Sequence, residues 1–288
     1  MTTQQWLEKG AYFEYKGQQI FYQEATNPDA PTILLLHGFP TASWDWHKIW
    51  PSLGQQFHLI APDFIGYGFS DKPEKHPYSI IDQAALCKEL LLQKNITKAH
   101  ILAHDYGDTV AQELLAQFLE GSLNFEIESL CLLNGGLFAE SHRPRLIQKL
   151  LLSPIGRFLS PFVGKSSLHK NFKRIFGPNT QPTLEEIDEF WKLVDYNNGK
   201  KIFHLLIRYI PERRQYRERW VSALQNNSIP IRLINGPKDP ISGQHMVDRY
   251  RELISNPDVV VLENIGHYPN TEAPQALLKH YLEFVTKS

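Results

Sequence analysis

Ala103-His104-Asp105-Tyr106-Gly107 is the most informative stretch of this 288-residue chain. An apolar run over residues 99–102 precedes it and predicts a buried strand, and residues 109–115 follow with the spacing of an amphipathic helix. Ala103 and Gly107 lie two places before and after the polar centre. Small residues are needed there because a sharp strand-to-helix turn is strained and brings the backbone close to its neighbours. The pattern predicts a nucleophile elbow.

The polar centre of the predicted elbow is an aspartate, Asp105, where many such elbows carry serine. A serine must be activated by a base before it can accept an acyl group. An aspartate is ionised at neutral pH and needs no such base. Asp105 is therefore expected to attack a saturated, electrophilic carbon and to form an ester.

The rest of the chain alternates between predicted strands and predicted helices. Residues 11–15 and 18–23 flank Lys16-Gly17 and predict a β-hairpin. Further strands are expected at residues 32–37, 57–62, 127–134, 230–235 and 259–262, and further helices at residues 44–53, 79–93, 244–254 and 274–285. An opening hairpin followed by repeated βα units predicts an α/β fold, in which a mostly parallel, eight-stranded sheet carries helices on both faces.

The alternation stops between Gly135 and Asn227, where amphipathic helical stretches, prolines and many basic residues replace it. We expect residues 1–135 and 228–288 to form the core domain and residues 136–227 to form an inserted helical cap. A separate binding domain is disfavoured because the sheet pattern resumes immediately afterwards. The arginine-rich run over residues 212–219 is interpreted as a solvated helix face, with partner docking or pocket gating as the alternative.

Composition excludes several classes of protein. Hydrophobic residues make up 42% of the chain and charged residues 21%, and the net charge is -1, so nucleic-acid binding is not expected. The two cysteines, Cys87 and Cys131, lie in apolar runs and are expected to be buried, reduced thiols. The sequence shows neither a signal peptide nor a membrane span, which predicts a cytoplasmic protein.

Two further residues follow late strands and complete a catalytic pattern with Asp105. Asp239 lies in Gly236-Pro237-Lys238-Asp239-Pro240, and His267 lies in the loop after the last strand. The chain order of nucleophile, acid and histidine is that of the α/β-hydrolase triad. Each residue alone has an ordinary explanation as a turn former or surface residue, but the three together at strand ends favour a hydrolase site.

The loop His37-Gly38-Phe39-Pro40 follows the third strand and provides a place for an oxyanion hole. The backbone amides of Phe39 and Tyr106 are the expected donors. Removing one such donor costs about 3 kcal/mol in comparable sites. No metal or organic cofactor is needed for this chemistry, and the expected partners are a small apolar organic substrate and water.

Several motifs resemble those of known proteins. His37-Gly38-Phe39-Pro40, the run DFIGYGFSDKP over residues 63–73 and the run HDYGD over residues 104–108 resemble the α/β-hydrolase branch that contains epoxide hydrolases and haloalkane dehalogenases. More closely, the chain resembles the mesoderm-specific transcript (MEST) family through Leu133-Asn134-Gly135-Gly136, His142-Arg143-Pro144 and Phe176-Gly177-Pro178. The resemblance covers nearly the whole chain from Trp6 onward. It implies the hydrolase fold and the triad of Asp105, Asp239 and His267. Animal members begin with an apolar membrane segment, which this sequence lacks.

The resemblance also bears on whether the substrate is an epoxide or a haloalkane. Epoxide hydrolases of this branch use two cap tyrosines; here Tyr209 and Tyr216, with Trp220 nearby, are the candidate substrate-binding residues. Phe158 and Phe162 stand where the first tyrosine is sought, which weakens this interpretation. Dehalogenases of the branch place Trp after the nucleophile and often Asn in the HGxP slot, and this chain has Tyr106 and Phe39. An epoxide-like substrate is therefore slightly favoured over a haloalkane.

Two questions stay open at this point. A hydrolase-like scaffold that binds a small ligand or a protein partner without turnover is the alternative to an enzyme. In either case the chain is expected to be a monomer or a homodimer. Asp108 is unusual, and we expect it to face the helix N-terminus as a first-turn residue. If it instead approached Asp105, repulsion between like charges would raise the pKa of that nucleophile.

Overall fold

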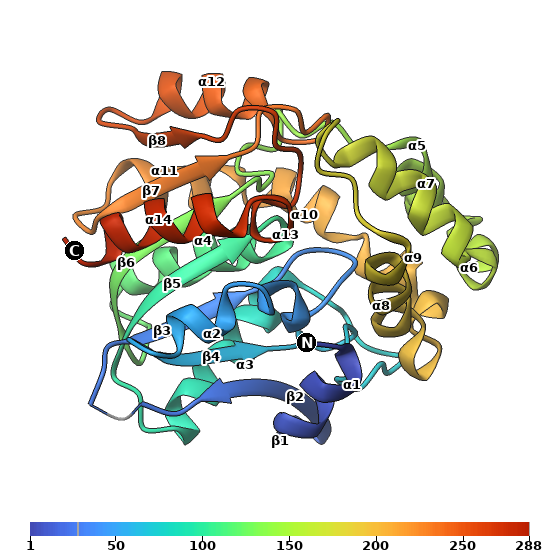
Figure 1. Ribbon diagram of the computed structural model, residues 1–288, viewed down its shortest axis with the longest axis horizontal. Helices are drawn as coiled ribbons and strands as arrows, with labels where there is room; N and C mark the ends of the chain where they lie inside the picture. Colours follow the sequence, from blue (N-terminus) through green and yellow to red (C-terminus); the bar gives the residue numbers. More distant parts are fainter. Residues whose placement is uncertain (28, 288) are drawn as a thin grey trace.

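One eight-stranded sheet runs through the computed structural model, which describes residues 1–27 and 29–287. The strands span Ala11–Tyr15 (β1), Gln18–Ala25 (β2), Thr32–Leu36 (β3), His58–Pro62 (β4), Lys98–His104 (β5), Glu126–Leu133 (β6), Ile231–Asn235 (β7) and Asp258–Val261 (β8). Their order in the sheet is β1-β2-β4-β3-β5-β6-β7-β8 (Figure 1). β2 pairs antiparallel with β1 and β4, and all other pairs are parallel. The predicted fold class is confirmed.

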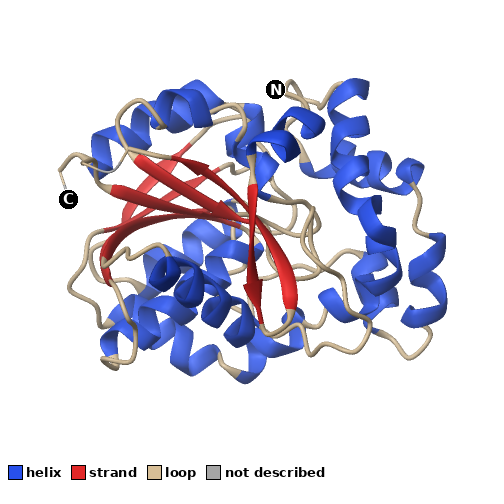
Figure 2. Cartoon of the chain, turned by 90° about the horizontal axis from the view of Figure 1, so that it is seen from below, coloured by secondary structure: helices blue, strands red, loops and turns tan. Residues whose placement is uncertain are grey.

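Helices cover both faces of this sheet (Figure 2), which explains why β3 is a continuous apolar run. Leu34 and Leu36 pack into one buried cluster, whereas Ile33 and Leu35 pack into the other. The first cluster includes side chains of α3 (Ile80–Gln93), α4 (Tyr106–Leu119), α11 (Arg217–Gln225) and α12 (Gln244–Leu253). The second includes side chains of α1 (Thr3–Lys9), α2 (Trp50–Leu53) and α14 (Pro274–Val285).

Two differences from the predicted elements lie near the N-terminus. Helix α1 was not predicted, and its start is fixed by a capping box in which Thr2 and Gln5 bond each other's backbone amides. The helix expected at residues 44–53 is instead split into a 3-10 turn, η1 (Ser43–Trp46), and α2. Cys87 and Cys131 are buried and unpaired, as expected.

Among the residues described, the segment between β6 and β7 holds helices and no strand. They are α5 (Leu146–Leu152), α6 (Gly156–Leu159), η2 (Ser160–Phe162), α7 (Lys165–Ile175), α8 (Leu184–Asp195), η3 (Tyr196–Ile202), α9 (Phe203–Leu206), α10 (Tyr209–Gln215) and α11. Helices α5 to α9 lie beyond the carboxyl ends of the parallel strands (Figure 1), whereas α11 packs against α4. We therefore propose the division into a core of residues 1–135 and 228–288 and a cap of residues 136–227.

Candidate active site

The turn between β5 and α4 holds Asp105 in a strained conformation. Its φ of 48° lies in the left-handed region that side-chain-bearing residues rarely adopt. Gly107 is required two residues later, because a Cβ atom there would lie 2.4 Å from the carbonyl oxygen of Leu36. The Asp105 amide donates to the Leu133 carbonyl of the neighbouring strand. The strained turn therefore presents the carboxylate at the end of the central strands.

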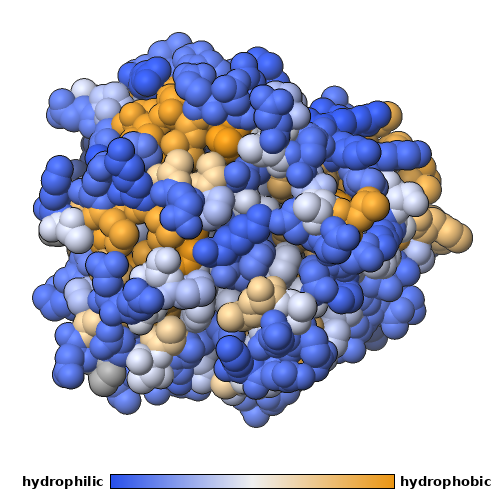
Figure 3. All heavy atoms as spheres, in the orientation of Figure 1, coloured by the Kyte–Doolittle hydropathy of each residue, from blue (hydrophilic) through white to orange (hydrophobic). Residues whose placement is uncertain are grey.

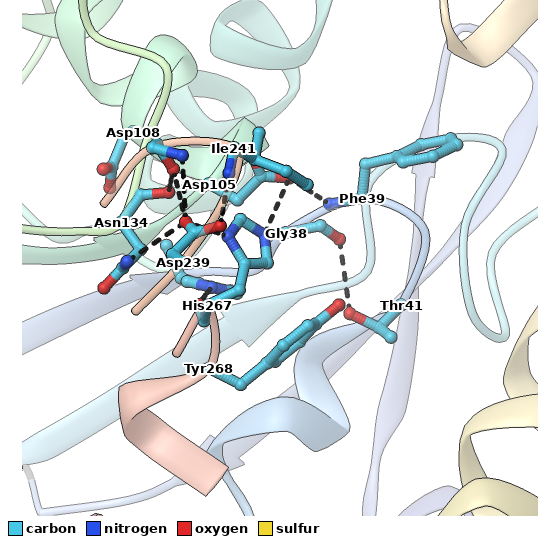
Figure 4. Close-up of polar contacts among 12 residues, drawn as sticks. Gly38, Phe39, Thr41, Asp105, Asp108, Asn134, Asp239, Ile241, His267 and Tyr268 are labelled. Atoms are coloured by element: carbon cyan, nitrogen blue, oxygen red, sulfur yellow. Dashed lines mark hydrogen bonds and ion pairs between the residues drawn. The ribbon is translucent and has the colours of Figure 1, made fainter. Parts of the chain in front are cut away.

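The structure brings Asp105, Asp239 and His267 together at the carboxyl end of the sheet (Figure 4). Asp239 follows β7, and its Oδ2 accepts a hydrogen bond of 2.7 Å from Nδ1 of His267. His267 is in the loop between β8 and α13 (Pro269–Glu272), and its Nε2 lies 4.0 Å from Oδ2 of Asp105. The imidazole is thus held by one carboxylate and faces the other.

Asp239 is buried but accepts hydrogen bonds on both oxygens, from the amides of Ile241 and Ser242, the Ser242 hydroxyl and the Asn134 amide group. Burial alone would raise the pKa of Asp239, but the His267 charge and these bonds lower it to about 2. Burial alone would likewise lower the pKa of His267, and Asp239 followed by Asp105 raises it to about 9. The pair therefore rests as a carboxylate beside an imidazolium.

The loop after β3 supplies an amide to the Asp105 carboxylate. The Phe39 N–H donates to Oδ2 of Asp105 across 3.1 Å. Tyr106 is the first residue of α4, so its amide has no acceptor within the helix. His37 orders the loop: burial lowers its pKa to about 3, and the neutral ring accepts from the Phe64 amide and bonds the Gly38 carbonyl.

Arg213 of α10 is a site residue that the sequence reasoning missed. The arginine-rich run was interpreted as a solvated helix face, and this was wrong for Arg213, which is 3% exposed. Its guanidinium donates to the Thr109 hydroxyl, to the Asp105 carbonyl oxygen and to Nδ1 of His142, and it lies 3.8 Å from Oδ1 of Asp105. Burial and the arginine charge lower the pKa of His142 to about 3, so that ring is a neutral acceptor.

Two motifs that carry the family resemblance hold the loops of Asp239 and His267 in place. Asn134 donates to Asp239 and to the Gly236 carbonyl, and accepts from the Gly236 amide, which joins β6 to the acid loop. Glu272 accepts hydrogen bonds from the amides of Gly177, Gly266 and Tyr268. The Phe176-Gly177-Pro178 motif therefore ties the cap to the histidine loop.

Asp108 lies in the first turn of α4, as expected, and is fully buried. Its Oδ1 accepts from the Leu133 amide at 3.3 Å, and its Oδ2 has no hydrogen-bond partner among the described residues. Burial raises the pKa of Asp108 well above its usual value, and the charge of Asp105 acts in the same direction. Burial and the neighbouring charge of Asp105 therefore both disfavour a charge on the Asp108 carboxyl.

A largely apolar cavity opens over Asp105. It encloses about 720 Å³ of empty space, its open mouth included, and Asp105 and His267 both line it. Most of the lining residues come from the cap and most are aliphatic or aromatic, with Arg145, Gln148 and Asn171 among the polar ones. A cavity of this character suits a small, mainly apolar molecule.

The predicted cap residues are placed differently from one another. The buried Tyr209 packs its ring on Phe39, and its hydroxyl accepts from the cavity residue Gln148 at 3.4 Å. The rings of Tyr216 and Trp220 pack against each other at a tilt and do not line the cavity, and the Trp220 indole donates to Glu113 of α4. We therefore assign these two no part in substrate binding.

Three aromatic side chains named in the sequence analysis also lie off the cavity. Phe158 and Phe162 are 59% and 85% exposed on the cap surface. Tyr106 packs its ring on Phe64 and Tyr67 and does not line the cavity. Its side chain therefore offers no donor to a leaving group there. In the described part of the chain, no three metal-binding side chains converge and no helix is long and apolar enough to cross a membrane.

Comparison with known proteins agrees with this architecture. The alpha/beta hydrolase fold family matches residues 31–274. Mesoderm-specific transcript protein of Mus musculus is 43% identical over 292 residues, which cover 97% of this chain and 87% of the mouse protein. The epoxide hydrolase CorEH has a TM-score of 0.79 at 20% identity, covering 96% of this chain and 98% of that chain. A loop variant of haloalkane dehalogenase DbeA from Bradyrhizobium elkanii has a TM-score of 0.80 at 21% identity, covering 96% of each chain.

The two solved structures are similar in fold, and the family match and the mouse relative extend over most of the sequence. The predicted family is confirmed. This chain is an α/β-fold hydrolase that belongs to the mesoderm-specific transcript family.

Proposed function

We propose that Asp105 is the nucleophile of a two-step hydrolysis of a small apolar electrophile, with an epoxide as the preferred substrate class. In the first step a carboxylate oxygen of Asp105 bonds to an epoxide carbon, and the ring C–O bond breaks to leave an alkoxide that takes up a proton. In the second step water adds to Cγ of the resulting ester while His267 takes its proton. The bond between Cγ and the substrate oxygen then breaks, and the departing oxygen takes the proton back from His267, which releases a diol.

The observation that carries the proposal is the shared position of Asp105 and His267 on one cavity wall. Nε2 of His267 faces the Asp105 carboxylate while Nδ1 is held by Asp239. This is the arrangement in which an imidazole can reach a water molecule beside an ester on Asp105. The Phe39 amide already bonds Oδ2, the oxygen that would carry negative charge when water adds.

The charges of the site give the order of events a physical basis. The negative charge of Asp105 helps to keep the pKa of His267 high, so the resting imidazole is protonated. Conversion of Asp105 to a neutral ester removes that support. The pKa of His267 then falls, and the ring becomes able to accept a proton from water only after the first step has occurred.

The lining of the cavity bears on the choice between an oxygen leaving group and a halide. A halide is stabilised by N–H donors, and the side-chain amides of Gln148 and Asn171 are the candidates on the cavity wall, whereas the side chain of Tyr106 does not line it. An alkoxide needs an O–H donor, and the proposed one is Tyr209, which does not itself line the cavity but whose hydroxyl accepts a hydrogen bond from the cavity residue Gln148. The similarity of fold to both an epoxide hydrolase and a haloalkane dehalogenase supports either chemistry, so both substrate classes belong in the test.

The test traps the ester. His267→Gln is incubated with 1,2-epoxyhexane or with 1-bromohexane, and the intact mass is measured, followed by peptide mapping. The proposal predicts an adduct on Asp105 with the epoxide and a weaker or absent one with the bromide. The double variant Asp105→Asn/His267→Gln is the matched control and stays unmodified. An adduct at another residue, or none with a broad panel of epoxides and haloalkanes, would favour a non-catalytic scaffold.

A further inference from the structure

Charge is strongly segregated along this chain. Residues 141–175, which we call the basic cap segment, contain eight Lys and Arg residues and no Asp or Glu. The other 253 residues hold 22 Lys and Arg against 31 Asp and Glu. The segment covers α5, α6, η2 and α7, at the edge of the molecule away from the sheet (Figure 1). A near-neutral protein thus presents one strongly cationic region.

The same segment exposes large apolar side chains. Of the 11 large hydrophobic residues exposed in the described chain, five lie in it: Leu146, Leu150, Ile155, Phe158 and Phe162. Phe162 is 85% exposed and Leu146 is 73% exposed. Figure 3 shows hydrophobic spheres at the right-hand edge, where Figure 1 places α6. Clustered apolar residues on a surface indicate contact with another apolar phase or molecule.

The basic cap segment also surrounds the entrance to the active site. A groove lined by Arg143, Arg145, Lys170 and Arg174 adjoins the cavity, and Asn171 and Arg145 line both. Leu146 and Leu150 form part of the same groove, and no carboxylate lines it. None of the four cations forms an ion pair with a described carboxylate. The groove therefore offers free positive charge beside exposed apolar groups.

We propose that the basic cap segment docks on the surface of an anionic lipid bilayer. Exposed Leu and Phe side chains enter the boundary between headgroups and acyl chains, while Lys and Arg contact the anionic headgroups. This occupant matches both properties of the surface. A second copy of the chain fits less well, because a symmetric contact would bring the two cationic regions together. A free polyanion would leave the apolar residues without a partner.

Docking in this way would turn the groove and the cavity behind it toward the bilayer. An apolar substrate could then pass from lipid to Asp105 without crossing water. This consequence, unlike the docking itself, rests on the proposed function. The docking test therefore measures vesicle binding and not turnover. It is repeated with Asp105→Asn, which should bind vesicles as the unmodified chain does, so the docking proposal is tested whether or not the proposed function holds.

The experiment is flotation of the full chain with vesicles of phosphatidylcholine, alone or mixed with phosphatidylglycerol. We expect binding to the mixed vesicles and little to the neutral ones. Lys149→Glu/Arg157→Glu/Lys170→Glu should weaken binding about tenfold or more. The control Lys9→Glu/Lys75→Glu/Lys279→Glu changes the net charge equally at exposed positions elsewhere and should bind as the unmodified chain does.

A second pair of variants tests the apolar contribution. Phe158→Asn/Phe162→Asn should also weaken binding about tenfold, whereas Leu92→Asn/Leu119→Asn, at exposed sites outside the segment, should not. Circular dichroism and melting temperatures verify that each variant folds. Absence of binding to mixed vesicles at low salt, or equal losses in the control variants, would overturn the proposal. So would sedimentation showing that the unmodified chain is a dimer that Phe158→Asn/Phe162→Asn dissociates.

Discussion

The two walls of the candidate site are built in different ways. On the sheet side, Asp105, Asp239 and His267 are almost fully buried, and each is fixed by backbone or side-chain hydrogen bonds. On the cap side, the wall is mostly apolar, and the outer surface carries exposed Leu, Phe and unpaired cations. The difference indicates that the sheet edge determines the chemistry, whereas the cap determines which molecules reach it and from where.

Among these variants, removal of the proposed nucleophile, Asp105, should have the largest effect on activity. Asp105→Ala should reduce turnover of an epoxide about ten-thousandfold or more, because no other group on the cavity wall can form the ester. The melting temperature should change by only about a few degrees, because the substitution leaves the backbone conformation of the turn in place and removes one hydrogen bond, from the Phe39 amide. Steady-state kinetics and calorimetry check the two expectations. Retention of more than a hundredth of the activity would mean that the sheet edge does not supply the nucleophile.

Arg213 lies where the two walls meet, since it comes from the cap and bonds the elbow. Arg213→Met should lower the free energy of unfolding by about 2–4 kcal/mol, because His142 and the Asp105 carbonyl lose a buried donor. It should also lower kcat about a hundredfold, with a smaller change in KM, through a misplaced Asp105. Urea unfolding and kinetics measure both effects. The adjacent, exposed Arg214→Met is the control and should change neither.

The charge pair on the sheet side predicts a dependence of stability on pH. The pKa of His267 is raised from 6.5 to about 9 in the folded chain. Its stabilising contribution is therefore complete below pH 6.5 and is lost as the pH rises through 9. The difference in unfolding free energy between the unmodified chain and His267→Gln should shrink by up to about 3 kcal/mol between pH 6 and pH 10. The surface variant His280→Gln should show no such trend.

Tyr209 tests the cap's part in the chemistry. Tyr209→Phe should slow epoxide opening about tenfold, because the proposed O–H donor to the alkoxide is lost. Release of bromide from 1-bromohexane, measured in the same preparation, should be unaffected by the change. Tyr216→Phe is the matched control, since that ring packs on Trp220 away from the cavity. Equal losses with both substrates would indicate altered packing and not a lost donor.

Asp108 should give the smallest effect. Burial disfavours a charge on this carboxyl, so Asp108→Asn should keep the activity within about twofold and the stability within about 0.5 kcal/mol. By contrast, Gly135→Ala should destabilise the chain, because its Cβ would lie 2.0 Å from Oδ2 of Asp108. Thermal unfolding of the two variants side by side checks this. A large loss with Asp108→Asn would mean that the carboxyl is charged and needed as such.

The predictable part of the site is the part set by local sequence. Asp105, Asp239 and His267 each follow an apolar strand within a few residues, and parallel strands bring their carboxyl ends to one edge. Arg213 could not be found in this way, because Thr109 and the Asp105 carbonyl lie 104 and 108 residues away along the chain. A run of arginines looks the same in sequence whether one member is buried or all are solvated.

The cap was less predictable for a related reason. Helical spacing shows that α11 has an apolar face but does not show which element that face meets. Trp220 was expected near the substrate, and tertiary packing instead places it against α4, with its indole on Glu113. Helix α1 was missed because its signal is only the short capping box at Thr2. The sequence therefore predicted the helices of the cap better than the contacts that these helices make with distant segments.

The most direct test of the account follows the oxygen atom. If water adds to Cγ of an Asp105 ester, turnover of 1,2-epoxyhexane in ¹⁸O-labelled water places the label in the Asp105 carboxylate, while the diol of the first turnover carries the original carboxylate oxygen. Peptide mass spectrometry after several turnovers should find ¹⁸O at Asp105 and none at Asp239. Labelled diol from the first turnover with an unlabelled Asp105 would show that water attacks the substrate directly and would contradict the account.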